Sequence, residues 1–197
     1  FMRALEKLRF GDPLDPTSFA GPLINRAAVE KVLRYNAMAA EHAMDVCFPG
    51  GEIQPVPGSR GHFVSPCMYG IHANSKSLTL REEVFGPHVA LVPFRTDEEA
   101  AAIYNDTEYG LSMAVITESY RRMRFFRDEC EYGMGYVNLP CIGAEVHLPF
   151  GGVKKSGNGR PSAAGLLHAV THSTAFTVNH GTEIKMAQGL AANLNQQ

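Results

Sequence analysis

HVALVPFRTDEEAAAIY, residues 88–104, is the stretch that decides the fold class of this chain. Its first part, HVALVPF, is a short apolar run that is typical of a buried strand. Thr96 to Glu99 form a capping box, which satisfies free N–H groups at the start of a helix expected over 98–104. Three more elements are expected downstream: a strand over 111–117, an amphipathic helix over 119–130 and a strand over 135–138. This alternation predicts an α/β fold, with a parallel sheet that carries helices on both faces.

The residues before this stretch carry a second strong helical signal. Asn25 offers a side-chain oxygen to cap a long helix that we expect to reach about His42, because apolar residues recur there near a 3.6-residue period. A short opening helix over 2–8 is expected to stop at the proline-rich turn 11–16. Two short strands are expected in this part, over 46–48 and 62–64. Glycines at 50–51 and the glycine- and proline-rich run 55–61 separate them and disfavour regular structure.

The last third of the chain is richer in glycine. A glycine-rich stretch over 143–160 precedes a helix expected over 162–171 and a strand expected over 175–178. The sequence contains no internal repeat. We therefore divide the chain into three parts: a domain portion over 1–172, a terminal strand segment over 173–181 and a polar tail over 182–197.

Composition excludes several classes of protein. The 197 residues are 45% hydrophobic and carry a net charge of −2, so no global field favours nucleic acid or anionic lipid. No apolar run approaches the ~20 residues of a membrane span. The 4 cysteines show neither the density nor the spacing of a disulfide scaffold, which indicates a reducing, cytoplasmic compartment.

Taken alone, few residues point to chemistry. The glycine-rich run 150–160 lacks the lysine directly after its second glycine that a phosphate-binding Walker loop needs. His168 and His172 stand four apart on the expected last helix, but no third ligand has metal-site spacing, so we predict no metal site. Cys141, in the loop before the glycine-rich run, is a candidate reactive thiol, and a structural role is the alternative.

Glu82 and Glu83 form the other candidate for chemistry. Consecutive residues of an extended segment point to opposite faces, so only one of these carboxylates can face inward. One buried carboxylate is the sharper hypothesis. A solvated pair of charges ahead of the turn at 84–87 is the alternative.

Seven segments carry a resemblance to a known family, in this order: GDPLD at 11–15, GPLI at 21–24, EEVFGP at 82–87, Asn105 with YGLS at 109–112, VN at 137–138, LPFGGVK at 148–154 and SGNGR at 156–160. Together they resemble the C-terminal part of the catalytic domain of aldehyde dehydrogenases. The resemblance extends from Phe1 to about His180. Each motif alone is modest evidence, but their collinear order makes coincidence hard to sustain.

The resemblance implies NAD or NADP as the cofactor and an aldehyde as the substrate. It places Glu83 on the nicotinamide-ribose hydroxyls, Phe85 beside that ribose, and Phe150 in the aldehyde tunnel. It also implies that the attacking cysteine and the other catalytic residues precede Phe1, so we assign no catalytic residue here and expect a fragment without its nucleophile. Residues 175–178 resemble a strand through which family members form homo-oligomers, dimers or tetramers.

The substrate class rests on a shorter motif. Residues 142–145, IGAE, resemble the branch that acts on amino-acid semialdehydes such as α-aminoadipic semialdehyde. In that branch the N–H groups of Gly143 and Ala144 would receive the substrate carboxylate. A loop in which Gly143 only makes a turn is the alternative.

Two other functions stay open at this point. A non-catalytic assembly module, related to aldehyde dehydrogenases, would explain the missing nucleophile, and a discrete oligomer of the isolated chain would favour it. An acyl-phosphate reductase relative would share the fold and the thioester chemistry, and NADPH-dependent reduction of an acyl phosphate by the full-length protein would decide for it.

Overall fold

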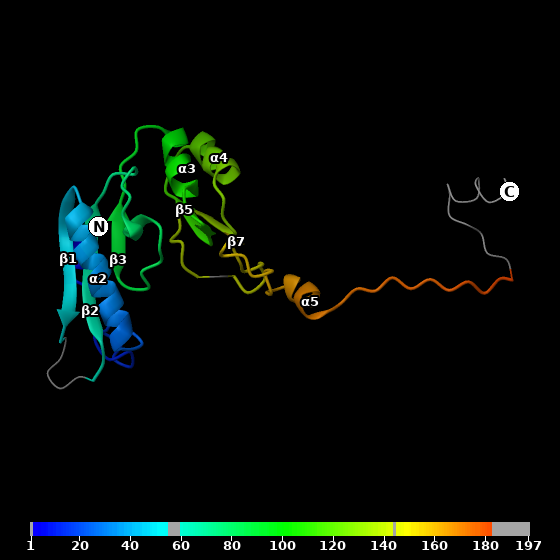
Figure 1. The fold of residues 1–197 in the computed structure, drawn as a ribbon, viewed down its shortest axis with the longest axis horizontal. Helices are drawn as coiled ribbons and strands as arrows, with labels where there is room; N and C mark the ends of the chain where they lie inside the picture. The colour runs from blue at the N-terminus through cyan, green and yellow to red at the C-terminus, as the bar shows by residue number, and fades with distance from the viewer. Residues whose placement is uncertain (1, 55–59, 144, 183–197) are drawn as a thin grey trace, which may run out of the picture.

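A computed structural model describes residues 2–54, 60–143 and 145–182 and confirms the α/β class. Figure 1 shows one helix lying across a sheet at one end of the molecule, a pair of helices beside a small sheet in the middle, and an extended C-terminal segment. The elements, in chain order, are α1 (Met2–Leu5), α2 (Arg26–His42), β1 (Asp45–Ile53), β2 (Phe63–Gly70), the 3₁₀ turn η1 (Leu78–Leu80), β3 (His88–Leu91), α3 (Asp97–Asn105), β4 (Tyr109–Gly110), β5 (Ser112–Val115), α4 (Tyr120–Glu129), β6 (Met134–Val137), β7 (Val153–Lys154) and α5 (Gly165–Val170).

The long helix α2 begins and ends where the sequence predicts. The Asn25 side chain accepts a hydrogen bond of 2.9 Å from the Ala28 N–H, which satisfies one of the free donors at the helix start. The helix then packs on β1 and β2 and buries Val29 and Val32 completely. It supplies most of one core cluster, which consists of Val29, Val32, Tyr35, Val64 and Val84.

The first sheet has the order β1-β2-β3 and is mixed rather than parallel. β1 pairs with β2 antiparallel, and β2 pairs with β3 parallel. β1 also runs straight through Gly50 and Gly51, so the predicted break at 50–51 is wrong. Gly50 has φ +65°, and a Cβ there would lie 2.5 Å from the Asn36 amide nitrogen of α2. The glycine therefore permits close helix packing inside a strand, instead of ending it.

The second half of the chain forms two further small sheets, so the single parallel sheet expected from the alternation is wrong. β5 and β6 pair parallel, while β4 pairs antiparallel with the distant β7. The predicted cap at Thr96 is confirmed, since its side chain accepts from the Glu99 N–H at 3.1 Å. The Ser119 side chain caps α4, which was not predicted from the sequence. α3 and α4 pack on each other beside these strands.

The glycine-rich run is a close packing feature. Gly151 and Gly152 are buried, and a Cβ on Gly133 would lie 1.8 Å from the Gly151 carbonyl oxygen. The Gly110 N–H also donates to the Ser156 hydroxyl at 3.3 Å. Backbones therefore approach one another here more closely than any side chain allows.

The helices at the two ends of the chain are shorter than the sequence suggests. α1 ends at Leu5 rather than residue 8, and α5 covers only Gly165–Val170. Residues 175–178 have extended backbone without an assigned strand in the described chain and lead away from the rest of the molecule. The polar tail is outside the described residues from 183 onward. None of the described helices has both the length and the apolar character that crossing a membrane would require.

The packing at Gly133 yields a stability prediction. Gly133→Ala would drive a methyl group into the Gly151 carbonyl, so we expect a loss of about 1–3 kcal/mol in the free energy of unfolding. Thermal unfolding of the purified protein would measure it as a lower Tm. Gly51→Ala is the matched control, because a Cβ at that position meets nothing within 4 Å. Equal melting temperatures for the two variants would contradict the proposed packing.

Candidate functional site

The candidate site surrounds the segment that links η1 to β3. A cavity of about 470 Å³ opens beside it, and an adjoining cavity of about 400 Å³ shares Arg81, Glu82, Glu83 and Tyr109 with it. Side chains from distant parts of the chain meet at the first cavity: Lys31, Arg81, Glu82, Glu83, Phe85, Glu108, Tyr109 and Lys155. Six of these eight side chains are charged when ionised, and the other two are aromatic, which makes this a polar site with aromatic walls.

Lys31 of α2 organises the centre of this cavity. Its ammonium group donates a hydrogen bond of 2.7 Å to the Glu83 carbonyl oxygen. The same group lies 5.7 Å from the ring centres of both Tyr35 and Phe85, which is within the range of cation–π attraction. Lys31 therefore holds the backbone of Glu83 and the ring of Phe85 with one charge.

The expectation that one of the two glutamates is buried is wrong. Both Glu82 and Glu83 are exposed, and Val84 is the residue of this segment that enters the core. The Glu82 carboxylate accepts a hydrogen bond from the Tyr35 hydroxyl. The Glu83 carboxylate has no hydrogen-bond or ion-pair partner within the described residues. Glu83 is thus an open acceptor at the cavity.

Phe85 stands beside this acceptor. Its ring is 72% exposed, and its backbone has φ +58°, in the left-handed region that non-glycine residues rarely adopt. Such a conformation costs of order 1–2 kcal/mol and persists only when its surroundings hold it. The structure therefore brings Glu83 and Phe85 together, as the sequence predicts, and displays both on one cavity.

Ion pairs form the rest of the wall. The Arg81 guanidinium lies 2.6 Å from the Asp106 carboxylate, and its hydrogen bond holds the pKa of Asp106 below its usual range. Lys155 lies 2.5 Å from Glu108, and this hydrogen bond raises the pKa of Lys155. These pairs are exposed and contribute little stability. With Glu82 bonded to Tyr35, Glu83 is the cavity carboxylate that has neither a cation nor a hydrogen-bond donor among the described residues.

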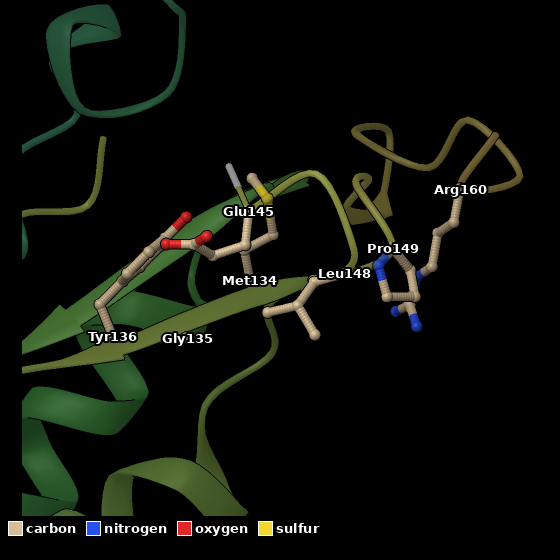
Figure 2. A pocket seen from close by; sticks show the side chains of 8 residues that line it. Met134, Gly135, Tyr136, Glu145, Leu148, Pro149 and Arg160 are labelled. Atoms are coloured by element: carbon tan, nitrogen blue, oxygen red, sulfur yellow. The ribbon is translucent and has the colours of Figure 1, made fainter. Parts of the chain in front are cut away.

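A second cavity, of about 260 Å³, lies at β6 and the start of the glycine-rich run. Figure 2 shows Glu145 beside Tyr136 on one side of it and Arg160 beyond Pro149 on the other, with Leu148 between them. The lining combines a carboxylate and a guanidinium with apolar side chains. It can accept a molecule that has an apolar body and a charged end.

Gly143 and Phe150, both predicted to bind the substrate, do not line this second cavity, but each contacts or adjoins a residue that does. The Gly143 carbonyl accepts a hydrogen bond of 2.6 Å from the Tyr136 hydroxyl, and Gly143 has φ +91°. Phe150 follows Pro149 directly and is 38% exposed. Ala144 lies outside the described residues. Gly143 therefore needs to be glycine for its turn, and its binding role stays a prediction.

The other candidates carry less chemistry. α5 ends at Val170, so His172 is not on the helix with His168, and both side chains are exposed. No group of three His, Cys, Asp or Glu side chains gathers as a metal site among the described residues. Burial raises the pKa of the Cys67 thiol, whereas Cys141 is exposed.

Sequence reasoning gave no role to five residues that line the first cavity: Lys31, Arg81, Glu108, Tyr109 and Lys155. Lys31, Tyr109 and Lys155 come from α2, β4 and the glycine-rich run, and only the folded chain brings them together. Lys31 and Tyr35 are one helical turn apart on the face that α2 turns toward Glu82 and Glu83. That spacing is a signal, but it needs the position of the partner segment to acquire meaning.

Comparisons with known proteins identify the class. The sequence model of the "Aldehyde dehydrogenase family" matches residues 1–176. The chain is 39% identical over 160 residues to the mitochondrial succinate-semialdehyde dehydrogenase of Oryza sativa subsp. japonica, covering 81% of this chain and 29% of the relative. It is 37% identical to a betaine aldehyde dehydrogenase of Cereibacter sphaeroides, and the match covers 89% of this chain and 35% of the relative. The chain belongs to the aldehyde dehydrogenase family.

Solved structures agree with this assignment. The crystal structure of PnpE from Pseudomonas sp. WBC-3 matches with a TM-score of 0.82 and 32% identity, covering 97% of this chain and 38% of that one. A betaine aldehyde dehydrogenase from Staphylococcus aureus, solved in complex with NAD+, matches with a TM-score of 0.69 and 28% identity, covering 80% and 31%. The chain thus spans about a third of the length of these relatives.

Tyr104, which lines the adjoining cavity, gives a pH prediction. Burial raises its pKa to about 12, while its unfolded-state pKa is about 10. A pKa that is higher in the folded state means that this stabilisation is present below pH ~10 and is lost as the pH rises toward ~12. We expect the fall in Tm from about pH 9 to about pH 11 to be smaller in Tyr104→Phe. Tyr120→Phe, at an exposed tyrosine, should behave as the wild type; an unchanged fall in Tyr104→Phe would contradict the assignment.

Proposed function

We propose that this chain forms one wall of the active site of an NAD- or NADP-dependent aldehyde dehydrogenase. The full-length enzyme would oxidise an aldehyde to a carboxylate through a cysteine thioester. The observation that carries the proposal is the open Glu83 carboxylate, displayed beside exposed Phe85 on a cavity of about 470 Å³. Membership of the family supports the same function.

The residues present fit a dinucleotide. An ionised carboxylate is purely an acceptor, with room for two donors, which suits the paired hydroxyl groups of a ribose. Phe85 would pack against the sugar, and Lys31 would keep both residues in place through its contacts with the Glu83 carbonyl and the Phe85 ring. When bound, the dinucleotide supplies the hydride acceptor for the oxidation.

The described cysteines are poor candidates for the nucleophile. Burial raises the pKa of the thiols of Cys67 and Cys130, which disfavours the thiolate form that attacks an aldehyde. Cys47, in β1, and Cys141, on an exposed loop, line none of the cavities described above. We therefore propose that the attacking cysteine belongs to a part of the full-length enzyme outside these residues.

We also propose that the extended segment 175–178 pairs with a second copy of the chain in a homo-oligomer. Phe176 is 87% exposed and Val178 is 52% exposed, so two apolar side chains of the same strand face stand in solvent in the single chain. A strand of a partner would satisfy the backbone and cover these side chains.

Glu83→Gln tests the cofactor role in the full-length enzyme. Two hydrogen bonds to a charged acceptor become bonds to a neutral amide, so we expect the Kd for NAD(P)+ to rise by about ten-fold and turnover to fall. The reactivity of the catalytic thiol toward an alkylating agent should not change, because Glu83 would contact only the cofactor. Titration calorimetry and alkylation rates would measure the two effects.

Glu118→Gln is the control for the loss of a negative charge. Glu118 is exposed and lies outside both cavities, so its variant should bind NAD(P)+ as the wild type does. An unchanged Kd and unchanged turnover in Glu83→Gln would refute the role proposed for Glu83.

For the substrate we propose an aldehyde that also carries a carboxylate, of the amino-acid semialdehyde kind. Arg160 places a guanidinium on the second cavity, and guanidinium groups bind carboxylates well. We expect kcat/KM for α-aminoadipic semialdehyde to exceed that for hexanal, which has the same chain length without the charges, by about ten-fold or more. Arg160→Met should remove most of this preference. Equal values for the two aldehydes in the wild type would exclude the semialdehyde class.

A further inference from the structure

A row of buried polar side chains crosses the core directly behind the Glu83–Phe85 segment. His88 Nδ1 lies 2.9 Å from the Asn36 amide oxygen of α2, and His88 Nε2 lies 3.0 Å from the Tyr69 hydroxyl of β2. The Tyr69 and His88 rings also meet edge to face, with 5.1 Å between their centres. Asn36 and Tyr69 are buried, at 7% and 0% exposure. Both nitrogens of the ring are therefore held, each by a different element.

With the Asn36 amide oxygen facing Nδ1, the contacts of the ring suit a neutral His88. The Asn36 oxygen can only accept, so Nδ1 carries the proton. In a neutral ring Nε2 is then an acceptor, and the Tyr69 hydroxyl donates to it. The neutral imidazole satisfies each contact with one donor and one acceptor, and the three side chains form a continuous bridge from α2 through β3 to β2.

This bridge fixes the end of the segment that carries Glu83 and Phe85. His88 is the first residue of β3 and follows Phe85 by three positions. The His88 N–H donates to the Gly86 carbonyl at 2.8 Å, and the Cys67 N–H donates to the Pro87 carbonyl at 2.8 Å. At the other end, Val84 is buried in the core. The strained Phe85 thus stands between two anchors, of which Val84 is apolar and His88 is polar.

We propose that His88, held by Asn36 and Tyr69, is a positioning residue that keeps Phe85 in its left-handed conformation and presents Glu83 to the dinucleotide. The proposal rests on the proposed function for the identity of that ligand. A hydrogen-bonded ring limits rotation and sliding of β3 in a way that an apolar contact does not, because each bond has a direction as well as a distance.

The surroundings of His88 add a pH dependence. The titratable groups facing it are the hydroxyl of Tyr69 and the thiol of Cys67, both on β2, and α2 contributes the uncharged Asn36. Burial alone lowers the pKa of His88 below its usual 6.5. The unfolded chain therefore binds the proton more readily, and the stabilisation from a neutral His88 decreases as the pH falls below 6.5. A loosened segment at low pH is the expected consequence.

The experiment is a double-mutant cycle in the full-length enzyme, with His88→Val and Glu83→Gln made singly and together. We expect His88→Val to raise the Kd for NAD(P)+ by about five-fold, the equivalent of one lost hydrogen bond, with a smaller effect on kcat at saturation. In the Glu83→Gln background the same change should have almost no effect on the Kd, because His88 acts through Glu83. Calorimetry measures each Kd.

Hydrogen–deuterium exchange supplies a readout that does not depend on the cofactor. Peptides covering 83–88 should exchange faster in His88→Val, and in the wild type they should exchange faster, relative to the intrinsic rate, at about pH 5.5 than at about pH 7.5. Ile71→Val is the packing control: Ile71 is buried at the end of β2, and its variant removes only a methyl group. It should lower the Tm without changing exchange at 83–88. Tyr69→Phe, which removes only the hydroxyl, replaces His88→Val if that variant does not fold.

Each outcome decides a different point. Unchanged exchange at 83–88 together with an unchanged Kd in His88→Val would overturn the positioning role. An equal rise in Kd in both backgrounds would also overturn it, because His88 would then act independently of Glu83. No effect of Glu83→Gln by itself would refute the proposed function, and the exchange data would still decide whether His88 holds the segment.

Discussion

The close approach of α2 to residues 83–88 is the constraint on which the rest of the site depends. A Cβ on Gly86 would lie 2.5 Å from a methyl group of Val32, so this position has no room for any side chain. Val84 enters the core that α2 covers, while Glu83 before it and Phe85 after it, with its left-handed backbone, are exposed. The packing of the apolar face of α2 thus determines that Glu83 and Phe85 reach the cavity.

Features that depend on neighbours in the chain could be predicted from the sequence. The caps at Asn25 and Thr96 each require a side chain and an N–H group only three residues away, and both are present in the structure. Strand pairing could not be predicted in the same way, because it depends on segments that are distant in the chain. Gly50 illustrates the difficulty. A glycine at this position indicates a turn in the sequence, but in the structure Gly50, with φ +65°, lies within a continuous strand and allows α2 to pack closely.

The site was predictable to a similar extent. Glu83 and Phe85 could be selected because their motif resembles a family pattern, and the structure places them on one cavity. The assumption that one of the two glutamates turns inward was wrong, since alternation holds only in extended backbone and the chain turns at Arg81 and Glu82. Lys31 and His88 could not be selected, because their importance lies in contacts with residues 52 positions away. Polar residues within a helix or strand pattern acquire a role only through such partners.

The two-residue ladder between β4 and β7 has a consequence for the order of folding. Its side-chain contact between Gly110 and Ser156 joins residues 46 positions apart, with only 2 residues paired in each strand. Closing so long a loop costs chain entropy before the buried glycines make their contacts, whereas residues paired in the β1-β2-β3 sheet are at most 25 positions apart. This ladder should therefore form late, and in the native protein it should be the first to open. The glycine-rich run would then be a segment of low local stability. The part of the molecule that contains β5 and β6 could open transiently while the part around α2 stays folded.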